Sequence, residues 1–408
     1  MFNIIKTHIC VIKKSVGKLT LFFFVVGISF NVYAGEESGF VSYAPGKGIN
    51  IESLELSIKP ETTLVLQGTP DPNKDGYSGG QFGVSWVGYL DITKKFGDFG
   101  FAYLQFKSGL GDTVEDSLDL LSGVNFNSYD VGGNIRLRRY YYVQHLFGKQ
   151  LNILIGRENP RDVLDQVKYA NDDDIQFLSN IFNKSPAMDW PSDYTFTIHA
   201  AIMPDAIDFL EFEFNFLEGD ADWQRIFEGG IYTWQLNFKP NKLFNLDTKK
   251  WEGNYRFYTW LNTRNHIKLV DESSAPSTDI KEFNYGIGTG FDQAIDEVFG
   301  LFGRLGWQRP DVLPADGGAN IELSWSAGIQ ANGRHWKREN DILAFAVGQD
   351  FPSKEYDDAG NDGANEGHFE TYYSFAITDY IHAGPDIQLI RRKDTNVFIY
   401  GCRLHVTF

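Results

Sequence analysis

The chain has 408 residues and a formal net charge of −17 at pH 7, with 37 Lys and Arg against 54 Asp and Glu. Such an excess of acidic residues makes the chain a poor candidate for binding nucleic acid or anionic membrane surfaces. The chain is 15% aromatic and contains 41 glycines, yet its mean hydropathy is only −0.29. Beyond the first 34 residues, no apolar run is long enough for a membrane-spanning helix, which excludes a helical membrane protein.

The first 34 residues have the pattern of a secretory signal peptide. Four lysines and no acidic residue precede an apolar run over 19–32, and Val32-Tyr33-Ala34 then leads into a polar stretch. A basic segment, a short apolar core and small residues before a polar start predict cleavage after Ala34. The alternative, a membrane helix, is disfavoured because the run is short. The segment 35–408 is then predicted to be one domain, with Cys402 as its only thiol.

The predicted elements are short strands in which apolar and polar residues alternate, the period expected of a strand with two different faces. Pro60 interrupts the first of them, and the last ends on Phe408 after placing Phe398, Tyr400 and Leu404 on one face. In chain order they are 54–66, 81–93, 99–107, 135–145, 151–156, 194–200, 210–216, 232–238, 255–264, 283–291, 299–308, 320–330, 343–347, 369–378, 386–389 and 397–408.

The connections between these strands alternate between long and mostly short ones. About sixteen strands of this length can cross a bilayer at a tilt, with long extracellular loops and short periplasmic turns. A closed wall satisfies every backbone group in lipid while needing only alternate apolar residues. The sequence therefore predicts an all-β fold, a transmembrane antiparallel β-barrel in a Gram-negative outer membrane. A secreted propeller or sandwich is the alternative, but no blade-length repeat is present.

The predicted inward faces mix both charges with aromatic rings. A row of basic side chains alone would favour an anion pore. Aromatic rings, guanidinium groups and carboxylates together suit a neutral polyhydroxylated solute. A generic solvated wall gives the same residue types, and an adhesin or structural barrel with an occluded lumen is a further alternative. The candidate lumen residues are Arg136, Arg138, Arg256, Arg264, Arg304 and Arg403, Glu211, Glu213, Glu322 and Glu370, and Tyr258 and Trp260, with Tyr140 and Tyr142 also expected to face inward.

Several blocks of sequence resemble the carbohydrate-selective porin family. They are S-W-S-A-G-I-Q-A-N-G (324–333), R-E-N-D-I-L-A-F-A-V-G-Q (338–349), E-T-Y-Y-S-F-A-I-T-D-Y-I-H-A-G-P-D-I-Q-L-I (370–390), G-G-Q-F-G with L-D-I-T (79–93) and N-I-L-I-G-R (152–157). The resemblance implies a sixteen-stranded channel favouring monosaccharides such as glucose, narrowed by an inward-folded loop. Residues 157–191 match that loop, with Arg157, Arg161, Lys168 and Trp190 as constriction candidates. The closing stretch 391–396 departs from the family pattern.

Expected partners follow from the same prediction. The closing strand, with Phe408, resembles the C-terminal signal read by the barrel-assembly machinery, and outer-membrane lipid and lipopolysaccharide would surround the wall. Two acidic stretches, 172–174 and 357–366, are predicted to be solvated exterior loops, with cation bridging to lipopolysaccharide as the alternative. No nucleophile motif accompanies the histidines, so we expect no enzyme, cofactor or metal. An anion-selective or general porin remains an alternative, and a homotrimer remains open.

Overall fold

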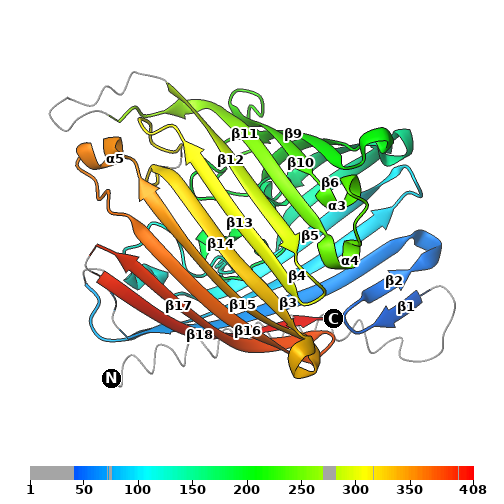
Figure 1. The fold of residues 1–408 in the computed structure, drawn as a ribbon, viewed down its shortest axis with the longest axis horizontal. Coiled ribbons are helices and arrows are strands. Elements are labelled where there is room, and N and C mark those ends of the chain that lie inside the picture. The colour runs from blue at the N-terminus through cyan, green and yellow to red at the C-terminus, as the bar shows by residue number, and fades with distance from the viewer. Residues whose placement is uncertain (1–40, 71, 73–75, 270–281, 316, 394) are drawn as a thin grey trace.

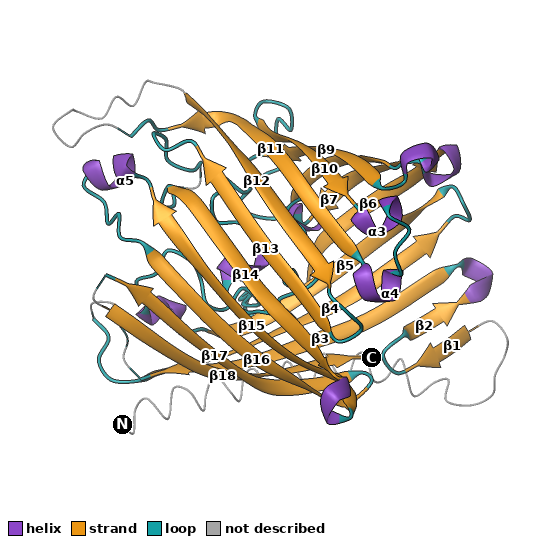
Figure 2. Ribbon diagram, in the orientation of Figure 1, coloured by secondary structure: helices purple, strands orange, loops and turns teal. Residues whose placement is uncertain are grey.

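A computed structural model describes residues 41–70, 72, 76–269, 282–315, 317–393 and 395–408. The predicted signal peptide lies outside these residues. Strands dominate, and no helix in the described part of the chain is long and apolar enough to cross a membrane. Figure 2 shows the sheet curling around on itself, with short helices confined to its ends and interior.

Sixteen of the eighteen strands found in the described residues form one closed antiparallel barrel, as predicted. They are β3 (Leu56–Thr69), β4 (Gln81–Lys95), β5 (Gly100–Asp112), β6 (Arg136–Leu146), β7 (Leu151–Glu158), β8 (Thr195–Ile202), β9 (Leu210–Glu218), β10 (Gly230–Phe238), β11 (Gly253–His266), β12 (Glu282–Ala294), β13 (Phe299–Gln308), β14 (Ile321–Gly333), β15 (Arg338–Pro352), β16 (Glu366–Thr378), β17 (Ile381–Arg392) and β18 (Thr395–Thr407).

The remaining elements are short. A hairpin that the sequence analysis missed, β1 (Val41–Ala44) with β2 (Gly48–Ile51), adds to the start of β3. The helices are α2 (Asn180–Asn183), α3 (Pro240–Leu243), α4 (Thr248–Trp251) and α5 (Lys354–Asp358), with the 3-10 turns η1 (Glu52–Leu54), η2 (Glu115–Ser117), η3 (Phe147–Lys149), η4 (Pro160–Asp162), η5 (Asp205–Ile207) and η6 (Arg334–Trp336). Figure 1 shows α3 and α4 at one end of the barrel and α5 at the other.

The barrel closes where β18 pairs with β3, and this explains why Pro60 is tolerated. On that edge of β3, β2 pairs as far as Ile58 and β18 begins at Glu61. Pro60 therefore sits between two partners, where its missing N–H leaves no ladder bond unmade. Its carbonyl still accepts the N–H of Phe408 at 2.9 Å. The strand is continuous through the proline.

The two faces of the last strand separate as its alternation predicted. Phe398, Tyr400 and Leu404 are 38–48% exposed on the outer face. Arg403 and His405 are buried on the inner face. Large apolar side chains on the outside and polar side chains within are the arrangement required of a wall in lipid around an aqueous interior.

A β-bulge in β6 reverses this alternation and contradicts part of the predicted facing. At Arg138 the β5–β6 register shifts by one residue, because Gln105 pairs with Arg139 and Phe106 with Leu137. A bulge puts an extra residue on one strand, so every later side chain changes face. Tyr142 is consequently exposed outside, whereas Tyr141 turns inward and stacks on Tyr103 with ring centroids 5.0 Å apart. The prediction that Tyr140 and Tyr142 face the lumen is wrong.

Candidate functional site

Residues 159–194, which connect β7 to β8, lie inside the barrel, and Arg304 on β13 is their central anchor. Its guanidinium donates to the carbonyls of Ala170 at 2.7 Å and Asp165 at 3.2 Å, and also to that of Phe182. Its Nε lies 3.3 Å from the carboxylate of Asp165, and both side chains are 1% exposed. A fork of fixed donors suits this task, because it satisfies several buried carbonyls from a single side chain.

Two further strand residues hold the inward segment from the same side of the barrel. Glu370 on β16 accepts the backbone N–H groups of Leu178 at 2.6 Å and Ser179 at 2.8 Å. Arg403 on β18 donates to the carbonyl of Asp173 at 3.1 Å and lies over the ring of Tyr372. These bonds matter because an irregular buried segment has no ladder to satisfy its own backbone.

Apolar packing completes the anchored face of the segment. One buried cluster joins Phe177, Ile181 and Phe182 of the segment to the strands β13, β15 and β16. A second joins Leu164, Met188 and Trp190 to β9, β10 and β11, and includes Tyr258 and Trp260. These two aromatic residues therefore support the segment and do not line open water.

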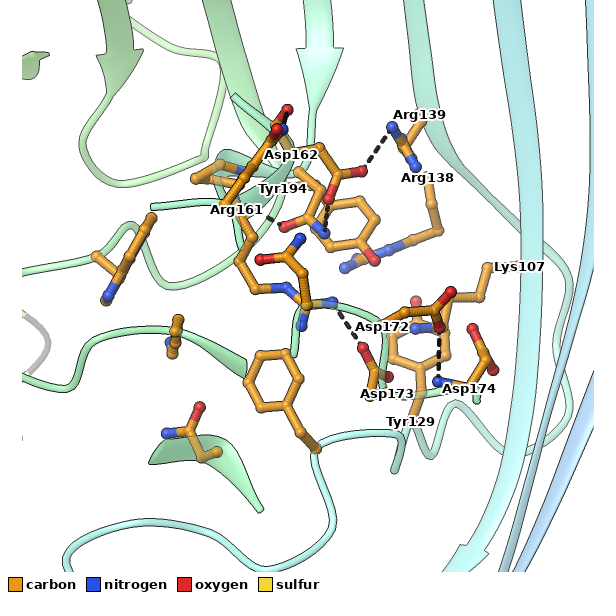
Figure 3. Close-up of a pocket in the computed structure, with 18 of the residues that line it drawn as sticks. Lys107, Tyr129, Arg138, Arg139, Arg161, Asp162, Asp172, Asp173, Asp174 and Tyr194 are labelled. Carbon is orange, nitrogen blue, oxygen red and sulfur yellow. Dashed lines mark hydrogen bonds and ion pairs between the residues drawn. The ribbon is translucent and has the colours of Figure 1, made fainter. Parts of the chain in front are cut away.

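The opposite face of the segment bounds a cavity of about 1130 Å³. The other walls come from the connection 113–135 and from β4, β5 and β6. Figure 3 shows side chains converging on this space from both the segment and the wall. The lining of this cavity is mainly polar and charged.

On the wall side, cations stack on tyrosines. The Arg138 guanidinium lies 4.8 Å from the ring centroid of Tyr129 and 4.4 Å from that of Tyr194. The same guanidinium donates to Asp193 at 2.7 Å. Lys107 lies over Tyr129 at 4.6 Å. Rings held by cations in this way keep their faces and edges in fixed positions along the cavity.

The segment itself contributes a paired charge. Arg161 and Asp173 lie 2.6 Å apart, and the Arg161 guanidinium covers the ring of Phe126. Burial would raise the pKa of Asp173, but the positive charges of Arg161 and Lys107 hold it below its usual range. Arg139 on the wall pairs with Asp162 at 2.8 Å and Glu158 at 2.6 Å. Positive and negative groups thus alternate around the cavity.

The acidic stretch 172–174 was predicted to be an exterior loop, and that prediction is wrong. All three carboxylates line the cavity (Figure 3), where Asp174 accepts bonds from Thr63 at 2.5 Å and Asn127 at 2.8 Å. Confinement inside the barrel, with the charges of Asp174 and Asp173, raises the pKa of Asp172 to about 7. The segment that carries these residues is drawn inward by its anchors, which composition alone does not reveal.

Fifteen of the sixteen predicted site residues fall into four groups. Arg138, Arg161, Lys168, Trp190 and Arg256 line the cavity. Tyr258, Trp260, Arg304, Glu370 and Arg403 hold the inward segment. Glu211 and Glu213 lie on the inner wall, beside Lys239 and Gln235. Three others do not line the cavity themselves: Arg136 is exposed at the strand end, Arg157 bonds Asp193 and Tyr194, and Arg264 bonds Gly219.

Glu322, the remaining residue, lies on the outer face. A register shift between Ile321 and Leu323 leaves it as the extra residue of a bulge, where it accepts the indole N–H of Trp307 at 3.2 Å. The prediction that Glu322 faces the lumen is wrong, because the alternation breaks at that bulge.

Sequence reasoning missed several cavity residues. Two of them, Lys107 and Arg139, sit on strands whose facing could be assigned only once the register was known. Seven more lie in the connections between strands, where no periodicity points inward: Tyr129, Asp162, Asp172, Asp173, Asp174, Asp193 and Tyr194.

Two groups of three ligand-type side chains occur among the described residues. Asp350, Glu366 and His368 are buried in the wall, where Glu366 accepts the N–H groups of Leu121 and Ser122 and contacts His368 at 2.8 Å. These bonds hold the connection 113–135 against β16. The second group lies outside the lumen, at the start of the β9–β10 connection.

Comparisons with known proteins agree with this architecture. The high-pH structure of Pseudomonas putida OprB aligns with a TM-score of 0.71 at 14% identity, over 86% of this chain and 94% of that one. The outer membrane channel DcaP of Acinetobacter baumannii aligns with a TM-score of 0.55 at 11% identity, over 88% and 99%. No curated protein matches in sequence.

A family model gives the assignment. The model described as carbohydrate-selective porin, OprB family, matches residues 105–408, about three quarters of the chain and most of the barrel. The fold predicted from the alternating strands and the resemblance read from the sequence blocks are both confirmed. The chain is therefore an outer-membrane β-barrel that belongs to the carbohydrate-selective porins of the OprB family.

Proposed function

We propose that this porin conducts small carbohydrates of monosaccharide size, such as glucose, by passive diffusion past the inward segment 159–194. The observation that carries the proposal is the mixture of donors, acceptors and rings around one cavity. Sugar C–H faces pack on aromatic rings, while hydroxyl groups exchange hydrogen bonds with guanidinium and carboxylate groups. Tyr129 and Tyr194 supply such rings, beside Arg138 and Asp193.

The charge balance of the cavity disfavours an anion channel. Selectivity for anions needs a surplus of positive charge along the path. The lining holds seven cationic side chains and eight carboxylates, so their formal charges nearly cancel. The cations are Lys107, Arg138, Arg139, Arg161, Lys168, Lys184 and Arg256, and the acids are Glu61, Asp91, Glu115, Asp162, Asp172, Asp173, Asp174 and Asp193.

Liposome swelling with the purified protein tests the proposal. We expect faster swelling in glucose than in a disaccharide, and faster swelling in glucose than in an uncharged polyol of equal size. Rates that depend on size alone would indicate a general porin. A strong chloride preference in a KCl gradient would indicate an anion pore, and absence of conductance would indicate an occluded barrel.

A ring substitution sharpens the test. Tyr129→Ala removes a stacking surface from the cavity, so glucose should interrupt the single-channel current less often while KCl conductance is maintained. Tyr142→Ala is the matched control, because Tyr142 is 37% exposed on the outer face. Equal effects of the two substitutions would contradict a role for the cavity ring.

The route to the membrane is also part of the proposal. We propose that the leader is removed after Ala34 and that the assembly machinery recognises the strand ending at Phe408. Outer aromatics such as Phe398 and Tyr400 on that strand support a lipid-facing surface. A homotrimer and contacts with lipopolysaccharide remain predictions, which native mass spectrometry of the detergent-extracted protein would test.

A further inference from the structure

Three carboxylates converge where β9 ends and its outer turn begins. Glu218 is the last residue of β9, and Asp220 and Asp222 follow at alternate positions in the turn. One oxygen from each lies within 4.8 Å of the others. The site faces away from the lumen, because the neighbouring Leu217 is the residue that packs on the inward segment. It is therefore separate from the cavity.

Glu218 is the buried member of this cluster. Its side chain is buried, with 1% exposure, and its Oε1 has no hydrogen-bond partner. Its Oε2 accepts the Thr195 hydroxyl at 3.3 Å, and the backbone N–H groups of Trp223 and Phe196 also interact with the carboxylate. A buried carboxylate oxygen without a donor is costly, and a bound cation would remove that cost.

The side chains around the cluster do not supply that charge. Among the described residues, Glu218, Asp220 and Asp222 form no ion pair. The nearby Arg225 is paired with Glu228 at 3.0 Å, and Arg264 donates to the carbonyl of Gly219 at 2.7 Å. The acidic stretch near α5 differs, because there Asp358 pairs with Lys354 and Asp362 with Arg392 and Lys393.

We propose that Glu218, Asp220 and Asp222 bind a calcium ion. All the ligands are oxygens, which suits a hard cation and disfavours metals that prefer nitrogen or sulfur. Asp222 uses one oxygen to accept the N–H of Gln224 at 2.6 Å and keeps the second for a ligand. Calcium tolerates six to eight oxygens in irregular geometry, whereas magnesium demands a regular octahedron that this exposed turn does not offer.

The bound ion would fix the turn against the outer wall of the barrel. Trp223 directly follows the ligand Asp222, and its ring lies 5.2 Å from that of Tyr140 and 5.4 Å from that of Phe196. Phe227 packs on Phe216 at 5.3 Å in the same turn. The ion would thus join the loop to an aromatic band at the rim, outside the path of any solute.

Terbium luminescence and calcium titration test the proposal on the purified protein in detergent. Excitation of Trp223 should sensitise bound Tb³⁺, and Ca²⁺ should displace it with a dissociation constant of about 10⁻⁴–10⁻³ M, as in other extracellular sites. The double variant Asp220→Asn, Asp222→Asn should weaken calorimetric Ca²⁺ binding at least tenfold. Asp358→Asn is the matched control and should bind as wild type.

Two further variants separate the ligands from the reporter. Trp223→Phe should lose sensitised emission yet retain calorimetric Ca²⁺ binding, and Glu218→Gln should weaken binding while KCl conductance is unchanged. No saturable Ca²⁺ signal in the wild type, undiminished binding in the double variant, or Mg²⁺ binding as tight as Ca²⁺ would each overturn the calcium assignment. Because the site lies outside the lumen, these outcomes are independent of the sugar-uptake assays.

Discussion

The two faces of the inward segment use charge in opposite ways. On the anchored face, Arg304 and Glu370 are buried and form hydrogen bonds with backbone groups of the segment. On the open face, Arg161 and Asp173 pair beside the cavity of about 1130 Å³. The same residue types therefore act as structural supports on one side and as candidate solute contacts on the other. A charged side chain supports the segment when it lies on the anchored face and is available to a solute when it lies on the open face.

Removing the central anchor should produce the largest effect. Arg304→Ala leaves the carbonyls of Asp165, Ala170 and Phe182 without donors and the Asp165 carboxylate without its cation. Breaking a buried pair of this kind costs about 3–5 kcal/mol. We expect a lower thermal midpoint and a larger, noisier single-channel conductance as the segment loosens. Arg334→Ala, which removes an exposed arginine at a turn, is the control and should alter neither quantity.

Two glutamate substitutions, one on the anchored face and one on the outer face, sharpen the comparison with a smaller effect. Glu370→Ala removes the acceptor for two buried N–H groups, and each buried group left unsatisfied costs about 1–3 kcal/mol. Glu322→Ala removes only an outer-face contact with Trp307 and should leave pore size unchanged. Exclusion of polyethylene glycols of graded size measures the pore in both variants. A wider pore in Glu322→Ala would contradict the placement of that residue.

The smallest predicted effect concerns the open face alone. Because the pKa of Asp172 is raised to about 7, its carboxyl is mainly neutral at pH 6 and mainly charged at pH 8. Lowering the pH across this range removes negative charge from the cavity, so cation preference should fall by about twofold or less. Reversal potentials in a KCl gradient measure the shift. Asp172→Asn should abolish the step, and a step that persists in this variant would assign it to another group.

The wall could be predicted from sequence more fully than the pore. Strict alternation located β4 as 81–93, against the observed Gln81–Lys95, since a strand with one face in lipid must keep its period. The same reasoning failed for Tyr140 and Tyr142, which follow the bulge at Arg138, and for Glu322, because a bulge depends on the partner strand's register. Asp172–Asp174 were misplaced for a different reason: only tertiary anchors on distant strands bring their loop inside.

The anchored face also has a consequence for how pore size can change. Arg304, Glu370 and Arg403 touch the segment from behind, and none of them lines the cavity. Substitutions at such hidden positions would shift the inward segment without altering any group that lines the cavity. The width of the pore and its preference among solutes could then be changed separately, by substitutions in different parts of the chain.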